Sequence, residues 1–452
     1  MLLKPQSSFF MYTIGTLATV PLEGGKPREI AEGVTSADWT PDGTGLVIVR
    51  ARTKLEFPIG KVLFQSAGWL SHPRFSPDGK SIAFIDHPTF GTIVGSFVTC
   101  DLKGTAKVIA RGFEWAGGVA WSPNGMEVWL SGTRSGETAQ QIFAISRDGK
   151  ERLVTRGAGS MTLHDIANDG QMLFSRDDLR QGIKALAPDN EERDLSWFDV
   201  SLMGAISADG EMIAFSESGE ATALKGYTYV RGIRGTPAVR LGEGRPYSIS
   251  PDKKWVVVTT GSFPPQLVLL PTSSGEPKRY PPIKDDISYP TFLGDGKQII
   301  FIRREGSSTR MYLLALDTGE VKPALPEGVI GIVVSPDGKR VIASSHSDPT
   351  DKIYDLAGGT PRPIKGIAQD EYVTAWGNPP LPLYVVGHEG SSKNLFRLDP
   401  VTGERRLWHS WIRAHPAGVW MNADLAVATN ALAYGYSYYS TLSQLYIAEG
   451  LR

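Results

Sequence analysis

The chain has 452 residues, of which 41% are hydrophobic and 21% charged, so a large buried core is available and a disordered chain is excluded. Its formal net charge is −1 and no Lys/Arg-rich run occurs, which argues against a nucleic-acid binder. Cys100 is the single cysteine and excludes an intrachain disulfide framework, whereas 50 glycines and 31 prolines are typical of a turn-rich all-β chain.

The first fifteen residues favour neither a signal peptide nor a membrane span. Their apolar part is short and is interrupted by Lys4 and Pro5 before it continues into strand-like sequence. Both kinds of segment need a longer uninterrupted apolar run, and no other stretch approaches that length. We therefore expect no membrane insertion of this chain, and the sequence leaves its localisation open.

Residues 13–30 predict a hairpin with its turn at Gly24-Gly25. The hairpin matches the third and fourth strands of a four-stranded blade, so the chain is expected to begin in mid-blade. A phrase of the type Ser-Pro-Asp-Gly then recurs between short strand-like runs, first at residues 40–43 and 76–79. Proline presets φ at the entry to a turn, and Asp-Gly tolerates the positive φ that a tight hairpin needs.

The turn phrase repeats with a period of about 42 residues from Gly43 to Gly338, with Lys253 in one glycine place. Each period holds four strand-like runs; one copy has residues 127–131, 141–145 and 151–154 after its turn. This pattern predicts an all-β chain, a β-propeller array of four-stranded blades. The irregular stretch at residues 194–199 marks an expected junction between an N-terminal propeller, residues 1–199, and a C-terminal propeller, residues 200–452.

Six polar residues flank or lie in the first strands of their blades and are expected near the mouth of a central channel, where propeller loops commonly bind ligands. These candidates are Asp38, His72, Arg74, His164, Asp165 and Glu371. His72 and His164 occupy corresponding places, so both could line the channel or hold a metal. Alternatively, each bonds a neighbouring backbone group inside its own blade. Four tryptophans in matching places are expected to pack between blades: Trp39, Trp121, Trp376 and Trp420.

No catalytic motif is evident in the chain. The Asp-Gly-Lys copies at residues 78–80, 295–297 and 337–339 lack the upstream glycine of a phosphate loop and lie on expected hairpins. Residues 434–438 come nearest to a nucleophile elbow but lack its second glycine. The kinase signatures are missing as well. We therefore expect no enzyme, no cofactor and no bound metal.

The repeated phrase resembles the TolB-like, WD-repeat-like (PD40) propeller repeats. Several unrepeated phrases are similar to the C-terminal propeller region of acidobacterial eukaryotic-like serine/threonine kinases, at residues 15–25, 55–63, 68–74, 163–166, 192–197, 265–271 and 442–451. The likeness covers nearly the whole chain, but the kinase domain and the membrane helix of that family are missing. It implies about twelve repeats in the family, hence two consecutive six-bladed-type rings with the first incomplete here. One large ring of about ten blades is the alternative.

The sequence leaves two functions open for this chain. The first is a non-catalytic interaction or sensor module that binds a protein, a peptide or a cell-envelope fragment. In the family context such a module is the extracytoplasmic, periplasmic part of a kinase-type receptor. The alternative is a propeller enzyme of the lyase or lactonase type, with acidic and histidine ligands around a metal in the central funnel.

Overall fold

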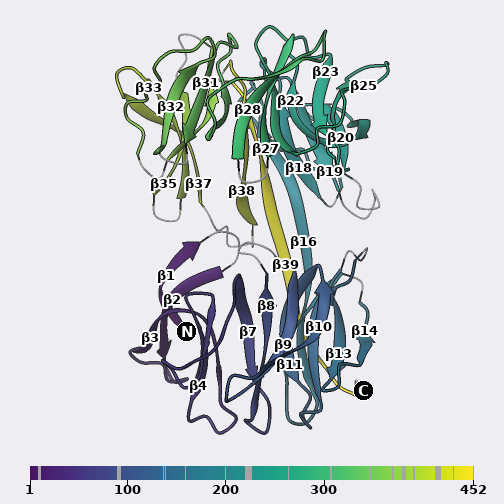
Figure 1. Cartoon of the computed structure of the whole chain (residues 1–452), viewed down its shortest axis with the longest axis vertical. Helices are drawn as coiled ribbons and strands as arrows, with labels where there is room; N and C mark the ends of the chain where they lie inside the picture. The colour runs from purple at the N-terminus through teal and green to yellow at the C-terminus, as the bar shows by residue number, and fades with distance from the viewer. Residues whose placement is uncertain are drawn as a thin grey trace. The chain divides into compact units, whose positions relative to one another are not determined.

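The computed structural model describes residues 1–8, 12–88, 93–135, 137, 139–157, 159–198, 200–218, 226–262, 264–305, 308–345, 348–368, 371–378, 383–389, 392–412, 419–430 and 432–450 (Figure 1). Every regular element in these residues is a β-strand. The predicted all-β fold, an array of mostly four-stranded antiparallel sheets as in a β-propeller, is confirmed. Across the same ranges there is no helix, and so none long and apolar enough to cross a membrane.

In the residues that the structure describes, the strands form nine sheets, which we letter in chain order. In the first part of the chain, sheet A contains β1 Leu2–Ser8, β2 Tyr12–Thr19, β3 Arg28–Trp39, β4 Leu46–Arg50, β5 Lys54–Glu56 and β6 Val62–Gln65; sheet B contains β7 Trp69–Phe75, β8 Ser81–His87, β9 Gly95–Asp101 and β10 Ala106–Phe113; sheet C contains β11 Trp115–Trp121, β12 Glu127–Thr133, β13 Gln141–Ser146 and β14 Glu151–Thr155. Sheet D joins distant parts of the chain: β15 Ser160–Ile166, β16 Met172–Leu186, β17 Glu192–Asp194, β38 Val419–Val427 and β39 Tyr434–Ala448.

The remaining five sheets each consist of four consecutive strands. Sheet E contains β18 Ser201–Ile206, β19 Met212–Glu217, β20 Tyr227–Gly232 and β21 Val239–Glu243; sheet F contains β22 Arg245–Ile249, β23 Trp255–Thr259, β24 Leu267–Pro271 and β25 Lys278–Arg279; sheet G contains β26 Asp286–Phe292, β27 Gln298–Glu305, β28 Ser308–Ala315 and β29 Val321–Pro323. Sheet H contains β30 Val329–Val334, β31 Arg340–Ser345, β32 Asp348–Asp355 and β33 Arg362–Pro363; sheet I contains β34 Tyr372–Trp376, β35 Leu383–Glu389, β36 Ser392–Leu398 and β37 Arg405–Ile412.

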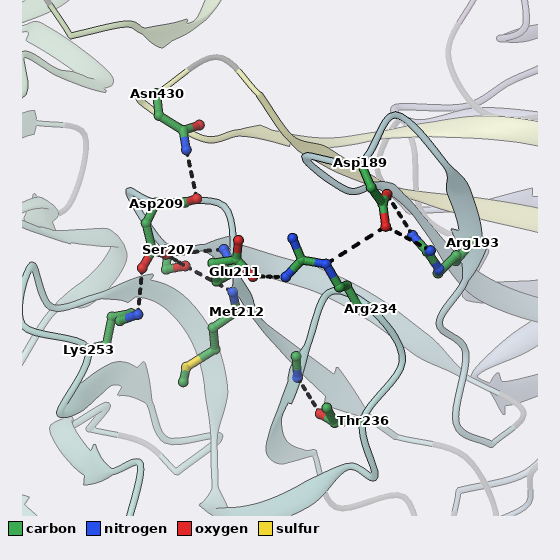
Figure 2. Close-up of polar contacts among 11 residues, drawn as sticks. Asp189, Arg193, Ser207, Asp209, Glu211, Met212, Arg234, Thr236, Lys253 and Asn430 are labelled. Carbon is green, nitrogen blue, oxygen red and sulfur yellow. Dashed lines mark hydrogen bonds and ion pairs between the residues drawn. The ribbon is translucent and has the colours of Figure 1, made fainter.

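The repeated phrase forms the turn between the first and second strands of a sheet. In sheet E, the Ser207 hydroxyl donates to Asp209 Oδ1 at 2.6 Å and accepts the Met212 N–H at 3.0 Å, while Asp209 Oδ1 accepts the Glu211 N–H (Figure 2). The glycine after the aspartate, or after Asn124 in sheet C, has a positive φ in each glycine-containing copy from Gly43 to Gly338. Lys253, in the glycine place of sheet F, adopts the same conformation with φ 58°. The turn prediction is therefore confirmed.

Neighbouring turns are also joined to one another by exposed polar contacts. Figure 2 shows Lys253 paired with Asp209, and the Asn430 amide donating to the Asp209 carbonyl at 2.7 Å. Arg234 pairs with Glu211, and its Nε lies 3.8 Å from Asp189. Surface ion pairs of this kind contribute at most about 1 kcal/mol each, so they align the turns more than they stabilise the fold.

The chain divides into two compact units, residues 1–178 with 442–452 and residues 179–441. Strands β16 and β39 lie side by side and each contributes residues to both units (Figure 1). The expected domains, residues 1–199 and 200–452, stay a prediction, as does the choice between two rings and one. We call the two compact units unit 1 and unit 2.

In unit 2, apolar side chains from each sheet pack against the next sheet. Shared cores join D to E, E to F, F to G, G to H and H to I, and a sixth core joins I back to D. The first strands β18, β22, β26, β30, β34 and β38 likewise lie beside one another, with β38 between β34 and β18. The series of contacts within unit 2 therefore returns to its start.

The same pattern in unit 1 joins sheet A to B, B to C and C to the β15 end of sheet D. The first half of β3 pairs with β2 and its second half with β4, so β1, β2 and the start of β3 form part of a sheet before the turn at residues 40–43. The predicted hairpin at residues 13–30 is confirmed.

Each first strand is interrupted by a β-bulge before its turn, which the sequence analysis did not anticipate. The register shifts in every described first-strand pairing, between Val34 and Ser36 in β3, for example, and between Ser288 and Thr291 in β26. A bulge inserts an unpaired residue and re-aims its side chain, and bulges are frequent near functional sites. The bulge residues are therefore candidate positions for a functional site.

Candidate functional site

Five of the six predicted residues lie on three first strands of unit 1. His72 and His164 occupy the bulges of β7 and β15, between Ser71 and Arg74 and between Leu163 and Asp165. Three charged residues stand two positions before the turn of their sheets: Asp38 on β3, Arg74 on β7 and Asp165 on β15. Electrostatic coupling links His72 with Arg74 and His164, and Asp38 with Arg74 and Asp165. We call these five residues the polar cluster.

The conformation of His72 is unusual for a residue with a large side chain. Its φ is 51°, in the left-handed region, and Pro73 follows it. Such a conformation costs roughly 1–3 kcal/mol and persists only where the surroundings enforce it. Backbone strain at a polar bulge is the kind of observation that motivates a functional hypothesis, so His72 is the starting point of the site.

A chain of hydrogen bonds fixes the tautomers of two histidines. The Val94 carbonyl lies 2.9 Å from His87 Nδ1, which must therefore donate to it. His87 Nε2 then accepts from the Ser71 hydroxyl at 2.9 Å, and the Ser71 oxygen accepts from His72 Nδ1 at 2.9 Å. His72 consequently carries its lone pair on Nε2. In this neutral form it offers the polar cluster a hydrogen-bond acceptor.

The imidazoles of His72 and His87 both stay neutral near pH 7. Burial lowers the pKa of His72 to about 4, and the charge of Arg74 acts in the same direction. Burial also lowers the pKa of His87 to about 4, against the opposite influence of its bond to Val94. A histidine with so low a pKa is a poor proton acceptor near neutrality, so His72 is better suited to accept a hydrogen bond than to act as a base.

Asp38 and Arg74 form the charged centre of the cluster. Asp38 Oδ2 accepts the Phe75 N–H at 2.9 Å, and Asp38 Oδ1 lies 3.8 Å from Arg74 Nη1. Burial raises the pKa of Asp38, against the opposing effects of the Phe75 N–H and Arg74. The hydrogen bond alone does not require a carboxylate, because Ser248 Oγ accepts the Phe292 N–H in the corresponding place of unit 2. The negative charge of Asp38 is thus available for another role.

His164 faces a second polar network. Arg74 Nη2 donates to the His164 carbonyl at 3.1 Å, which joins β7 to β15. The Ser175 hydroxyl donates to Asp177 at 3.1 Å, so its oxygen accepts from His164 Nε2 at 3.0 Å. His164 Nε2 is thus a donor. The cluster combines the imidazoles of His72 and His164, the carboxyl groups of Asp38 and Asp165, and the donors of Arg74.

The structure contradicts the prediction that His72 and His164 bond backbone groups inside their own blades. We expected each to bond a backbone group inside its blade if it had no role in the channel, but Nδ1 of His72 and Nε2 of His164 meet the serine hydroxyls Ser71 and Ser175. Those serines and His87 were missed by the sequence analysis. Small hydroxyl residues on strands are too common to signal a site without the fold.

Glu371, the sixth predicted residue, belongs to unit 2 and not to the polar cluster. Its carboxylate accepts from Arg405 at 2.7 Å and from the Ala368 N–H at 2.9 Å, and its side chain is 7% exposed. These contacts hold the segment before β34 against β37. The binding role predicted for Glu371 stays a prediction.

Of the four tryptophans, Trp121 and Trp376 lie in inter-sheet cores as predicted. Trp39 is 50% exposed, so the packing prediction is wrong there. The side chain of Trp420 lies outside the described residues.

The polar cluster contains the residue types of a metal site, but Arg74 already pairs with Asp38 inside it. Across the part of the chain that the structure describes, no group of three or more His, Cys, Asp or Glu residues is placed to hold a metal ion. Within the described residues, the cluster is held together by hydrogen bonds and by the pairing of Arg74 with Asp38.

No family model matches the chain, and no curated protein sequence matches it. Similar solved structures include an oligogalacturonate lyase from Vibrio parahaemolyticus, with 13% identity, TM-score 0.38 and coverage of 56% of this chain and 77% of that chain. A putative TolB from Agrobacterium tumefaciens has 15% identity, TM-score 0.30 and coverage of 74% and 94%. An oligogalacturonate lyase in complex with manganese has 10% identity, TM-score 0.31 and coverage of 83% and 96%. These neighbours are consistent with a TolB-like β-propeller, and at these values they carry no argument about function.

Proposed function

We propose that the chain is a non-catalytic interaction module that binds a peptide segment of a protein at the polar cluster of unit 1. The observation that carries this proposal is the convergence of five ionisable side chains from three first strands. The neutral imidazole of His72, the carboxyl groups and the guanidinium suit the alternating donors and acceptors of a peptide. With two carboxylates and one arginine, the cluster favours a peptide with a basic side chain.

The proposal extends to the biological setting suggested by the sequence. The resemblance to kinase-associated propellers makes the module the ligand-binding, extracytoplasmic part of a serine/threonine kinase-type receptor. The genomic sequence immediately upstream tests this part: an in-frame kinase domain supports it, and an unrelated gene product there refutes it.

The binding proposal is tested by selecting peptides from a random display library on the full chain. We expect enriched peptides to carry lysine or arginine and their affinity to fall with salt, because the attraction is between charges that water partly screens. Asp38→Asn should weaken a selected peptide about tenfold, the effect of losing one charge-assisted hydrogen bond, whereas Arg74→Gln removes a positive charge that repels a basic peptide and should not weaken it. Arg111→Gln, an exposed arginine on β10, is the matched control and should change nothing.

Failure to enrich any peptide, or equal binding by Asp38→Asn and the control, contradicts the proposal. The propeller enzyme is retained as a second candidate because two imidazoles and two carboxylates share one cluster. Stoichiometric metal after purification in chelator-free buffer, lost in a His72→Gln variant, would favour this enzyme over the interaction module.

A further inference from the structure

The first strands of the sheets, which we call the inner layer of each unit, differ in chemistry between unit 2 and unit 1. The positions two residues before each turn hold Asp38, Arg74, Ala120 and Asp165 in unit 1. In unit 2 they hold only uncharged residues: Ala205, Ser248, Thr291, Val333, Ala375 and Ala426. Two bulges of unit 2 hold tyrosines, the half-buried Tyr247 and the exposed Tyr289, whereas two bulges of unit 1 hold histidines. The two inner layers are therefore built for different ligands.

Four side chains of unit 2 form a continuous series of contacts across its first strands. Asp424 Oδ1 lies 3.9 Å from Arg245 Nη2, and the Arg245 guanidinium lies 5.4 Å from the Tyr247 ring centroid. The Tyr247 and Tyr289 rings meet edge to face with centroids 5.9 Å apart. The series runs from β38 across β22 to β26, and Tyr372 on β34 is coupled to Asp424 from the other side. We call Arg245, Tyr247, Tyr289, Tyr372 and Asp424 the tyrosine cluster.

The backbone around the cluster is arranged to permit these contacts. Strand β18 lies beside both β38 and β22, and its bulge residue is Gly204. A Cβ on Gly204 would stand 2.6 Å from Pro246, so only glycine allows the close approach of β22. Tyr289 has φ 52° and precedes Pro290, which repeats in unit 2 the strained conformation of His72. Strain at an exposed aromatic bulge again suggests a binding role.

The cluster faces water although protein surrounds it. Tyr289 and Tyr372 are 48% and 38% exposed, and the Arg245 side chain is 54% exposed. Burial nevertheless raises the pKa of Tyr372 and of Asp424.

We propose that the tyrosine cluster is a binding site for an uncharged saccharide. Tyrosine rings offer flat apolar faces for the C–H side of a sugar ring, together with hydroxyls at the rim. The ion pair of Arg245 and Asp424 cancels its own charge and presents planar donors and acceptors that match neighbouring hydroxyls. A proline-rich peptide could also stack on tyrosines, but it has no hydroxyls for the ion pair. The site is separate from the polar cluster proposed above.

The experiment uses the full chain and isothermal titration with the neutral hexasaccharides of glucose and of N-acetylglucosamine. Hexagalacturonate and decaproline are the charged and peptide comparisons. At least one neutral hexasaccharide should bind, and Tyr289→Ala and Arg245→Gln should each weaken it roughly tenfold, as loss of one stacking or charge-assisted contact predicts. Tyr446→Ala, an exposed tyrosine in unit 1, is the matched control and should bind as the parent chain does.

The inference is overturned if neither neutral hexasaccharide binds, or if only hexagalacturonate or only decaproline does. It is also overturned if Arg74→Gln weakens binding as much as Tyr289→Ala, since the saccharide would then occupy unit 1. Melting curves of all variants show whether each is folded. If Tyr289→Ala is unfolded, Arg245→Gln, which changes an exposed side chain, still tests the proposal. Peptide binding to the polar cluster is measured separately, so either proposal can fail alone.

Discussion

The buried imidazole of His87 should make the stability of unit 1 depend on pH. His87 is fully buried and stacks on Trp69, with the ring centroids 3.6 Å apart. Burial lowers its pKa to about 4, whereas an exposed histidine in the unfolded chain has a pKa of about 6.5. The unfolded state therefore takes up the proton first as the pH falls. The stabilisation is fully present above the unfolded pKa and is lost as the pH falls from about 6.5 towards 4.

These two pKa values predict a loss of about 2 kcal/mol of unfolding free energy between pH 7 and pH 5 for His87 alone. His72 is half-buried and its pKa is likewise about 4, so it should add a similar loss. The two rings share the Ser71 hydroxyl, and their contributions are therefore not independent. The parent chain should lose between about 2 and 4 kcal/mol over this range.

The assay is urea denaturation of the full chain at pH 7 and at pH 5, compared with the variant His87→Gln. The variant should show a pH-dependent loss smaller by about 2 kcal/mol, because its side chain does not titrate. Ser131→Ala is the matched control: it removes a buried hydroxyl that bonds the Leu163 N–H, and it should lower stability equally at both pH values. If His87→Gln keeps the pH dependence of the parent chain, the reasoning is refuted.

Three further substitutions test the packing of unit 2. Glu192→Ala removes the acceptor of the Tyr436 hydroxyl and leaves the Tyr434 hydroxyl only its contact with His409 Nδ1, so it should cost about 2 kcal/mol in urea denaturation; an unchanged midpoint would contradict this. Gly204→Ala forces a Cβ against Pro246 and should cost about 1–3 kcal/mol, which a melting temperature equal to that of the parent chain would refute. Ser207→Ala removes two hydrogen bonds of one turn and should cost about 1 kcal/mol by thermal melting, whereas a loss above about 3 kcal/mol would show that the turn does more than close a hairpin.

Local chemistry was sufficient to predict the turns from the sequence. Proline, aspartate and glycine act through φ and through hydrogen bonds within four or five residues, so the phrase carries its own structure. Lys253 shows that the repeat is strong enough to impose the left-handed conformation on a residue that does not favour it. The period between the phrases then gave the four-stranded sheets, because each interval holds enough chain for four short strands.

What the sequence did not reveal depends on contacts between distant residues. Sheet D pairs β16 with β39, and Glu192 bonds Tyr434 and Tyr436 more than 200 positions away. No repeat encodes that pairing. The bulges were missed for another reason: one inserted residue shifts the alternation of a short strand by one place, and a two-residue period read over five to seven positions cannot resolve it.

The bulges also explain how one repeat can yield two different inner layers. A bulge residue is not paired on the strand, so its side chain can change without loss of the ladder hydrogen bonds that hold the sheet. Histidine and tyrosine occupy such places at His72 and Tyr289, with nearly equal φ values of 51° and 52° and with a proline after each. The residue two places before the turn can also vary. Either the Asp38 carboxylate or the Ser248 hydroxyl accepts a backbone N–H from the first strand of the next sheet. Positions that the fold leaves unconstrained in this way can vary with the ligand, which is why the candidate sites lie there and not in the turns.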